Sequence, residues 1–301
     1  MADPRFDGSG VALITPFTPD GVNERVLADL VAFHHEERTD ALVVCGSTGE
    51  AAAMTAEEQY RAAACVVTAN SGRLPVIVGC GGTDTRQVVR LGEQARRAGA
   101  DAVLLSAPPY NKPPQRGIVD HFRAVMDAAQ LPAIIYNVPG RTSVNILPET
   151  IAQLAEDERV IGVKEACGDI VQIAELARLV GEHLAIWSGN DDQVVPIMSL
   201  GGRGVITVLG NVAPRDTSRM AHAYLEGELA EATSLQLGFL PLIRALFAEP
   251  NPIPVKTAVR WLGFAVGPLR QPLCEADPAR QQLVIQELEG RGIRRRTSAK
   301  S

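Results

Sequence analysis

Lys164 is the residue of this sequence whose type and position most directly suggest chemistry. It closes the apolar run Val160–Val163, and the chain holds only four lysines, while arginine supplies nearly all the other positive charge. An ammonium group at the buried end of a strand is costly unless it is paired or the amine is used. A neutral lysine amine can attack a carbonyl and form a Schiff base. The alternative is a side chain that reaches out of the strand to pair with Glu165 or Asp169.

A second cluster, Gly46–Glu50, has the composition of a small anion-binding loop. Its glycines let the backbone turn tightly and expose N–H groups beside the hydroxyls of Ser47 and Thr48. Such a loop can hold a small carboxylate, although the same residue types also make ordinary turns. The loop gains significance because it follows an apolar run, as Lys164 does.

Two tyrosines and an arginine follow two further apolar runs. Tyr110 lies in the proline-bounded segment Ala107–Pro113, and Tyr136 and Arg141 lie at the end of a later run. Each has a structural alternative, because a strand-end tyrosine is usually packed in a core and an arginine can cap a loop. If the strands that end at Tyr136 and Lys164 are neighbours, about 4.8 Å apart, both side chains can point into the same space.

These residues all follow short apolar runs that alternate with amphipathic stretches, as in parallel α/β proteins. The eight runs predicted as strands are Gly10–Pro16, Ala41–Cys45, Pro75–Gly79, Ala102–Ser106, Ala133–Asn137, Val160–Lys164, Leu184–Ser188 and Gly204–Leu209. Helix-start signals between them include Thr55 with Glu58 and Asp84 with Gln87. Eight such units predict a closed (β/α)8 TIM barrel, with an open doubly wound sheet as the alternative. Active sites of this barrel form where the strands end.

From about Pro214 onward the pattern becomes wholly helical, with helices predicted at Glu226–Ala248, Pro254–Gly263 and Pro278–Leu288. No linker rich in glycine or serine separates this part from the rest of the chain. We therefore expect a catalytic barrel over residues 1–226 and a C-terminal helical extension over residues 227–301.

Composition excludes several other classes of protein. The 301 residues are 46% hydrophobic and carry a net charge of -6, which argues against a nucleic-acid partner. No apolar stretch is long enough to span a membrane, and the N-terminus lacks the apolar core of a signal peptide, so a cytoplasmic protein is expected. The five cysteines contain no CxxC pair. His34–His35 and Asp191–Asp192 lack partners at ligand spacing, so no metal is expected.

Taken together and in order, these motifs are ones we identify with a known family. The chain resembles the dihydrodipicolinate synthase / N-acetylneuraminate lyase family of Schiff-base aldolases over nearly its whole length. The likeness extends from Gly10–Phe17 to Asn251–Thr257, and its specific motifs are Gly46–Glu50, Tyr136–Thr142 and Gly162–Ala166.

The resemblance implies a role for each candidate residue. Lys164 would condense with the keto group of pyruvate, and no cofactor would be needed because the Schiff base is itself the electron sink. Thr48 and Ser47 would hold the pyruvate carboxylate. The pocket would be lined by Gly189 and Ile206.

Proton transfer and assembly are implied in the same way. A hydroxyl relay would consist of Tyr136, Tyr110 and Ser47, with Tyr110 reaching across from a neighbouring subunit. The resemblance thus also implies a homotetramer built as a dimer of dimers.

Arg141 distinguishes among the members of the family. Synthases use an arginine here to bind the carboxylate of L-aspartate 4-semialdehyde, and a planar guanidinium suits a carboxylate. The implied reaction joins pyruvate to this semialdehyde, giving 4-hydroxy-tetrahydrodipicolinate on the route to lysine and diaminopimelate. Ser47 departs from the threonine more common in the synthases and is common in the lyases. The alternatives are therefore a pyruvate-dependent aldolase, a dehydratase of keto-deoxy sugar acids or a non-catalytic keto-acid sensor.

Regulation by lysine is expected to be weak or absent. In lysine-regulated relatives the effector occupies a dimer-interface pocket supplied by histidines, an asparagine, a glutamate and an aromatic residue. The matching positions here are Ala56, Gln59, Thr83, Gln87 and Pro109. These side chains provide no carboxylate for the effector's ammonium group.

Overall fold

The computed structural model describes residues 6–181 and 183–296 and contains a closed barrel of eight parallel strands. The barrel strands are β1 (Gly8–Ala12), β4 (Ala41–Val44), β5 (Val76–Cys80), β6 (Ala102–Ser106), β7 (Ala133–Asn137), β8 (Val160–Glu165), β9 (Ala185–Ser188) and β10 (Gly204–Thr207). Each strand pairs with the next, and β10 pairs with β1 to close the barrel. The predicted TIM barrel is confirmed, and the alternative of an open sheet is wrong.

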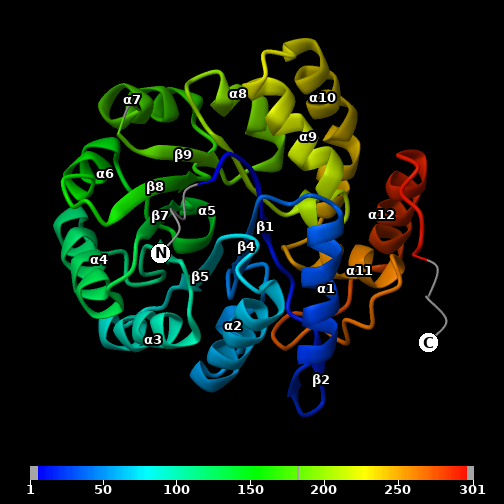
Figure 1. Cartoon of the computed structure of the whole chain (residues 1–301), viewed down its shortest axis with the longest axis horizontal. Coiled ribbons are helices and arrows are strands. Elements are labelled where there is room, and N and C mark those ends of the chain that lie inside the picture. The colour runs from blue at the N-terminus through cyan, green and yellow to red at the C-terminus, as the bar shows by residue number, and fades with distance from the viewer. Residues whose placement is uncertain (1–5, 182, 297–301) are drawn as a thin grey trace.

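Helices that follow the strands form an outer ring around the barrel (Figure 1). They are α1 (Glu24–Glu36), α2 (Ala56–Asn70), α3 (Thr85–Ala98), α4 (Gln115–Ala129), α6 (Pro148–Leu154), α7 (Ile170–Val180), α8 (Val194–Met198) and α9 (Pro214–Leu225). The short helix α5 (Pro139–Thr142) lies inside this ring, directly after β7 (Figure 1). Both predicted helix starts are confirmed: Thr55 and Glu58 form a capping box at α2, and Asp84 caps α3. The short hairpin of β2 (Phe17–Thr18) and β3 (Gly21–Val22) was not predicted.

Aromatic side chains fill the barrel interior near the ends where the strands begin. The rings of Phe6 and Trp187 stack with centroids 4.9 Å apart, and Trp187 Nε1 donates to the Phe6 carbonyl at 3.1 Å. Gly162 makes room for this packing, because a Cβ there would lie 2.2 Å from the Trp187 ring. The interior is therefore closed at one end, which leaves the other end for a site.

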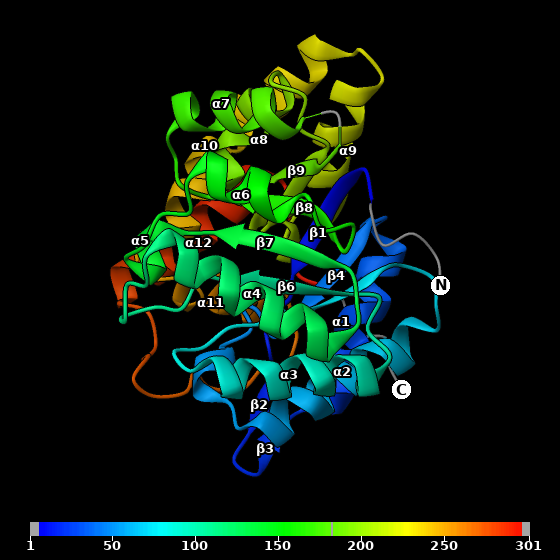
Figure 2. The same cartoon turned by 90° about the vertical axis from the view of Figure 1, so that its left-hand side faces the viewer.

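The opposite end of the barrel is where the strands stop and the candidate residues begin. Figure 2 shows β7 running toward α5 at this end. The boundaries predicted for the first strand are wrong, because β1 ends at Ala12 rather than Pro16. Leu13 and Ile14 are nevertheless buried, and Ile14 packs in a cluster with Val255 and Val259 of the C-terminal part. Leu13 packs in the core cluster of the barrel. The apolar run therefore continues beyond the strand because its residues are buried by the barrel core and by the extension.

The C-terminal part is helical, as predicted. It contains α10 (Leu229–Leu246), α11 (Ile253–Trp261) and α12 (Pro278–Gly290), which lie beside the barrel (Figure 1). α10 packs against α8, α9 and α12, and α11 packs against α12 and the short 3-10 helix η3 (Leu209–Asn211). Within the described residues, no helix combines the length and the apolar character needed to cross a membrane.

Candidate active site

Lys164 and Tyr136 occupy neighbouring strands at the open end of the barrel. They are register partners between β8 and β7, as expected if the two strands are adjacent. Both side chains are buried, with Lys164 only 5% exposed. The Lys164 Nζ atom lies 4.4 Å from the centre of the Tyr136 ring. A buried amine is thus held against the face of a tyrosine.

The acidic residues near Lys164 in sequence are occupied elsewhere. Glu165, on the outward face of β8, accepts hydrogen bonds from Asn137 Nδ2 at 3.1 Å and from the Cys167 N–H at 2.7 Å. Burial raises the pKa of the Glu165 carboxyl, and these hydrogen bonds oppose the rise. Asp169 caps the N-terminus of α7. The alternative in which Lys164 pairs with Glu165 or Asp169 is therefore wrong.

Gly189, which follows β9, and Ile206, in β10, are the residues that the resemblance assigns to a pocket lining. A Cβ atom on Gly189 would lie 3.2 Å from Lys164 Cε and 2.7 Å from Ala166 Cβ, so glycine leaves space beside the lysine. Ile206, in β10, is fully buried and belongs to the same interior cluster as Tyr136. Together with Lys164 and Tyr136, these two residues lie on, or directly after, four neighbouring strands, β7 to β10.

The Gly46–Glu50 loop follows β4 and is folded as a tight turn. The Gly49 N–H donates to the Gly46 carbonyl at 3.0 Å, and the Glu50 N–H donates to the Ser47 carbonyl at 3.1 Å. Ser47 is half-buried, whereas Thr48 is only 3% exposed. The Thr48 hydroxyl oxygen accepts a hydrogen bond from Asn251 Nδ2 at 2.9 Å. One hydroxyl of the pair is thus oriented by a residue about 200 positions later.

A buried ion pair fixes the end of this loop. Glu50 has φ of 56°, in the left-handed region, and its Oε1 accepts from Lys256 Nζ at 2.6 Å. Its second carboxylate oxygen accepts from the Arg270 N–H at 2.8 Å. The pKa of Lys256 lies below its usual value because burial outweighs the opposing effect of the Glu50 carboxylate. The loop is therefore anchored to the C-terminal extension by charge as well as by packing.

Arg141 lies on α5, directly beyond the strand that carries Tyr136. Its side chain is exposed at the end of the barrel, and Nη2 donates to the backbone carbonyl of Asn251 at 2.8 Å. Among residues 6–181 and 183–296, its guanidinium makes no other hydrogen bond, which leaves N–H groups to bind an incoming anion. Arg141 thus carries a positive charge at the open end of the barrel.

Tyr110 does not join Tyr136 within one chain. It is 87% exposed, in the loop between β6 and α4, and has φ of 67°. An aromatic ring that is so exposed is not part of the hydrophobic core of its own chain. The structure therefore brings Lys164, Tyr136, Gly189, Ile206, Thr48 and Arg141 toward one end of the barrel and leaves Tyr110 projecting from it.

Asp191 and His34, from the two residue pairs considered above as possible metal ligands, each contact other residues of the fold. Asp191 is buried and its Oδ2 accepts from the N–H groups of Val208 and Leu209 at 3.1 and 2.9 Å. Burial raises its pKa, opposed by these hydrogen bonds and by the charge of Lys164. His34 Nδ1 lies 2.9 Å from the Thr39 hydroxyl. These residues join neighbouring segments of the fold.

Asn251 and Lys256 were not assigned roles from the sequence. Both lie in the segment Asn251–Thr257, which had been noted only as a motif. The scarcity of lysine drew attention to Lys164, and the same argument applied to Lys256 would have indicated a second buried lysine. No comparable sequence signal marked the side chain of Asn251.

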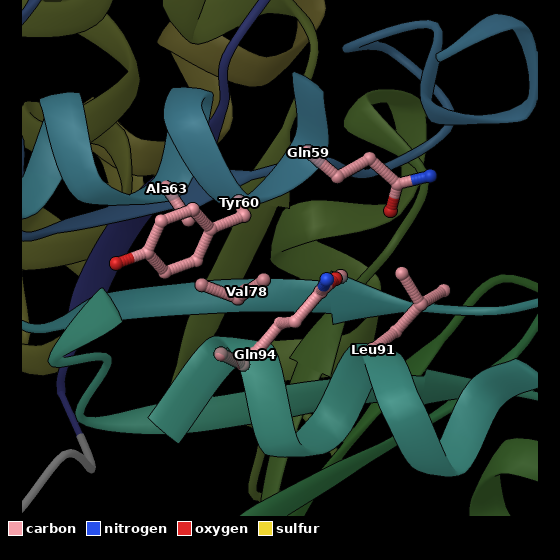
Figure 3. A pocket seen from close by; sticks show the side chains of 8 residues that line it. Gln59, Tyr60, Ala63, Val78, Leu91 and Gln94 are labelled. Carbon is pink, nitrogen blue, oxygen red and sulfur yellow. The ribbon is translucent and has the colours of Figure 1, made fainter. Parts of the chain in front are cut away.

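A small cavity between α2, α3 and β5 is unsuited to a substrate (Figure 3). Its volume of about 10 Å³ is room for roughly one water molecule. Gln94 lines it, and among the described residues the buried Oε1 atom of Gln94 has no hydrogen-bond partner. The candidate site is instead the open end of the barrel.

Comparisons with known proteins agree with this geometry. A family model described as the Dihydrodipicolinate synthetase family matches residues 5–290. The 4-hydroxy-tetrahydrodipicolinate synthase of Thermoanaerobacter sp. (strain X514) is 53% identical over 273 residues, which cover 90% of this chain and 92% of that protein.

Solved structures give the same result. Dihydrodipicolinate synthase from Aquifex aeolicus has a TM-score of 0.94 at 39% identity, covering 97% of this chain and 100% of that one. The chloride-inhibited dihydrodipicolinate synthase from Acinetobacter baumannii, complexed with pyruvate, has a TM-score of 0.93 at 36% identity, covering 96% of this chain and 100% of that one. The resemblance inferred from the motifs is confirmed.

Proposed function

The chain belongs to the dihydrodipicolinate synthetase family, and on this premise we propose that it condenses pyruvate with L-aspartate 4-semialdehyde. The product is 4-hydroxy-tetrahydrodipicolinate, and the enzyme is a lyase of lysine and diaminopimelate biosynthesis acting in the cytoplasm. The observation that carries the proposal is the buried amine of Lys164, which lies 4.4 Å from the centre of the Tyr136 ring at the open end of the barrel.

The first half of the reaction takes place at Lys164. The Nζ atom adds to C2 of pyruvate, and loss of water leaves a Schiff base between the two. Thr48 and Ser47 hold the pyruvate carboxylate, and Gly189 and Ile206 leave a narrow space for its carbon atoms. Loss of a proton from C3 then gives an enamine, whose C3 is the nucleophile for the next step.

The second half requires the semialdehyde to be oriented. The guanidinium of Arg141 binds its carboxylate by parallel hydrogen bonds. The enamine carbon forms a bond with the aldehyde carbon, and the aldehyde oxygen takes up a proton. The amino group of the semialdehyde then adds to C2 and displaces Lys164 Nζ, which closes the ring and regenerates the free amine.

Tyr136, Ser47 and Tyr110 carry the protons, with Tyr110 supplied by a neighbouring subunit. The 87% exposure of Tyr110 supports this arrangement, because its ring is free to enter another copy of the chain. The assembly proposed is a homotetramer in which each active dimer forms the minimum unit. An isolated subunit would lack one hydroxyl of its relay.

A comparison of two aldehyde substrates tests the proposed reaction. Initial rates are measured with pyruvate plus L-aspartate 4-semialdehyde and, separately, with pyruvate plus N-acetylmannosamine. We expect turnover with the semialdehyde alone. Turnover with N-acetylmannosamine instead would establish a lyase-type aldolase, the alternative that Ser47 favours. Schiff-base formation without turnover of any aldehyde would indicate a keto-acid sensor.

Subunit mixing tests the placement of Tyr110. Tyr110→Phe and Lys164→Ala subunits are each expected to be nearly inactive. Hybrid dimers contain one site with both native residues, so mixing should restore part of the activity. No recovery after mass spectrometry has verified subunit exchange would show that each site is built from one chain.

A further inference from the structure

Asn251 contacts both residues that we assign to substrate carboxylates. It lies just before α11 and is 7% exposed. Its side-chain Nδ2 donates to Thr48 Oγ1 at 2.9 Å, and its backbone carbonyl accepts from Arg141 Nη2 at 2.8 Å. One residue of the extension therefore bridges the proposed pyruvate site and the proposed semialdehyde site.

The direction of the hydrogen bond to Thr48 determines what the hydroxyl can do. A hydroxyl group has one proton to donate and two lone pairs that accept. Because Asn251 Nδ2 occupies a lone pair of Thr48 Oγ1, the threonine proton is left to donate to another acceptor. A carboxylate is such an acceptor, and a hydrogen bond to a charged group is stronger than one between neutral groups.

Asn251 is itself held in place by a nearby contact. Five residues later, Lys256 Nζ donates to Glu50 at 2.6 Å and to the Pro268 carbonyl at 2.9 Å. Thr48 and Glu50, two residues apart in the same loop, are thus both bound by the segment from Asn251 to Lys256. A hydroxyl positioned by a well-packed neighbour loses little freedom when a ligand arrives.

The side-chain oxygen of Asn251 has no hydrogen-bond partner in the described part of the chain, residues 6–181 and 183–296. This atom, Oδ1, is also buried. An unsatisfied buried acceptor is unfavourable for stability. Among the described residues, the Asn251 amide therefore makes its side-chain hydrogen bond through Nδ2 to Thr48.

We propose that Asn251 is a positioning residue that turns the hydroxyl proton of Thr48 toward the carboxylate of pyruvate. Its backbone carbonyl at the same time steadies Arg141, so the two carboxylate-binding side chains share one anchor. This inference rests on the proposed function, because it assumes that Thr48 binds pyruvate.

Asn251→Asp is the decisive variant, because it keeps the shape of the side chain but can only accept at Thr48. The threonine proton would then be donated to Asp, and the pyruvate carboxylate would meet a like charge. The pyruvate concentration for half-maximal borohydride trapping should rise by roughly 30-fold or more, since a charge-assisted hydrogen bond is lost. Asn251→Ala should raise it only a few-fold, and Asn70→Asp, at the distant end of α2, should leave it unchanged.

A double-mutant cycle separates orientation from charge. In a Thr48→Val background there is no hydroxyl to turn, so Asn251→Asp should cause a much smaller further rise. If the aspartate variant does not fold, as judged by thermal unfolding, the same cycle is run with Asn251→Ala, and the two substitutions should be non-additive. Additive effects would show that Asn251 does not act through Thr48.

The readout also separates this inference from the proposed function. Trapping uses pyruvate alone, so it reports on Asn251 even if the native enzyme fails to turn over the semialdehyde. If the native enzyme does turn over the semialdehyde and Asn251→Asp has native half-saturation for pyruvate, the inference is wrong and the function stands.

Discussion

The Nζ atom of Lys256 lies 2.6 Å from Oε1 of Glu50, and both side chains are almost fully buried. The described part of the chain therefore contains two buried lysines with different surroundings. Lys256 forms an ion pair with a carboxylate, whereas the Lys164 amine lies over the ring of Tyr136. Within the described residues, no salt bridge includes Lys164. The structure thus separates a lysine suited to anchoring from one suited to nucleophilic attack.

Covalent trapping should distinguish the two lysines. Pyruvate with borohydride should add one pyruvate-derived mass to the chain, located on the peptide that contains Lys164. Lys164 lies at the open end of the barrel, whereas the Lys256 amine is buried and already donates to Glu50 and to the Pro268 carbonyl. Lys164→Ala should abolish the adduct, and peptide mass spectrometry measures both results. Lys256→Arg, which keeps the charge, is the control that should retain it. An adduct on Lys256 in the native chain would overturn the site assignment.

Removing Lys256 should damage stability rather than chemistry. Lys256→Met leaves the Glu50 carboxylate buried and unpaired, which should lower the free energy of unfolding by about 3 to 5 kcal/mol. The double variant Glu50→Gln with Lys256→Met should recover most of this loss, because no unpaired charge remains. Urea unfolding of the three proteins measures the effect. A double variant as unstable as Lys256→Met would show that packing, not charge, is what Lys256 contributes.

The sequence predicted the barrel because its strands are buried on both faces and therefore appear as uninterrupted apolar runs. Lys164 and Tyr136 could be placed together for the same reason, since adjacent parallel strands end at the same level. The limit of this reasoning appears at β1, where Leu13 and Ile14 continue the apolar run. Ile14 is buried against the extension, whereas Leu13 packs in the core cluster of the barrel.

Contacts between distant parts of the chain could not be predicted from periodicity. Asn251 and Thr48 are 203 residues apart, and Lys256 and Glu50 are 206 residues apart. The hydrophobic periodicity of a strand or helix predicts that element but not which distant segment packs against it. Neither contact could therefore be predicted from the sequence. Tyr110 is a different case: its exposure is visible only in the structure, while its proposed partner is a second copy of the chain.

Replacing Arg141 should affect the second substrate selectively. Arg141→Leu should leave pyruvate trapping largely intact and lower kcat/KM for the semialdehyde by about 100-fold or more, since a charge-assisted pair is lost. Steady-state kinetics with the semialdehyde varied at saturating pyruvate measure the effect, and Arg178→Leu on the exposed face of α7 is the control. Unchanged semialdehyde kinetics would favour an aldolase that acts on a sugar-derived aldehyde.

The buried side chain of His34 should make the free energy of unfolding decrease in acid. Burial lowers the pKa of His34 to about 3 from a usual value of 6.5. The folded protein therefore keeps His34 neutral at pH 5, while the unfolded chain binds a proton there. Its contribution to stability is complete above pH 6.5 and is lost as the pH falls toward about 3.

His34→Gln removes this titration. Between pH 7 and pH 5 the native protein should lose about 2 kcal/mol more unfolding free energy than the variant does. Urea unfolding of both proteins at the two pH values provides the comparison. His121, whose pKa burial lowers to about 4, acts in the same direction in both proteins and so cancels from the difference. An equal pH dependence in the two proteins would mean that His34 is not kept neutral by the fold.

Lysine should inhibit this enzyme weakly or not at all. By the resemblance, an effector pocket would be formed by Ala56, Gln59, Thr83, Gln87 and Pro109. Gln59 uses its Nε2 to donate to the Ala51 carbonyl at 3.0 Å, so it is already engaged with the backbone. The five side chains contain no carboxylate to pair with an ammonium group.

The absence of a carboxylate should greatly weaken the binding of lysine at these positions. Loss of a charged partner in a desolvated site costs about 2 to 5 kcal/mol, enough to move a submillimolar effector out of the physiological range. A lysine titration of the initial rate tests this, with Gln87→Glu as the variant that restores a carboxylate and should increase sensitivity to lysine. Half-inhibition of the native enzyme below about 1 mM, a binding free energy near 4 kcal/mol, would show that other residues form an effector site.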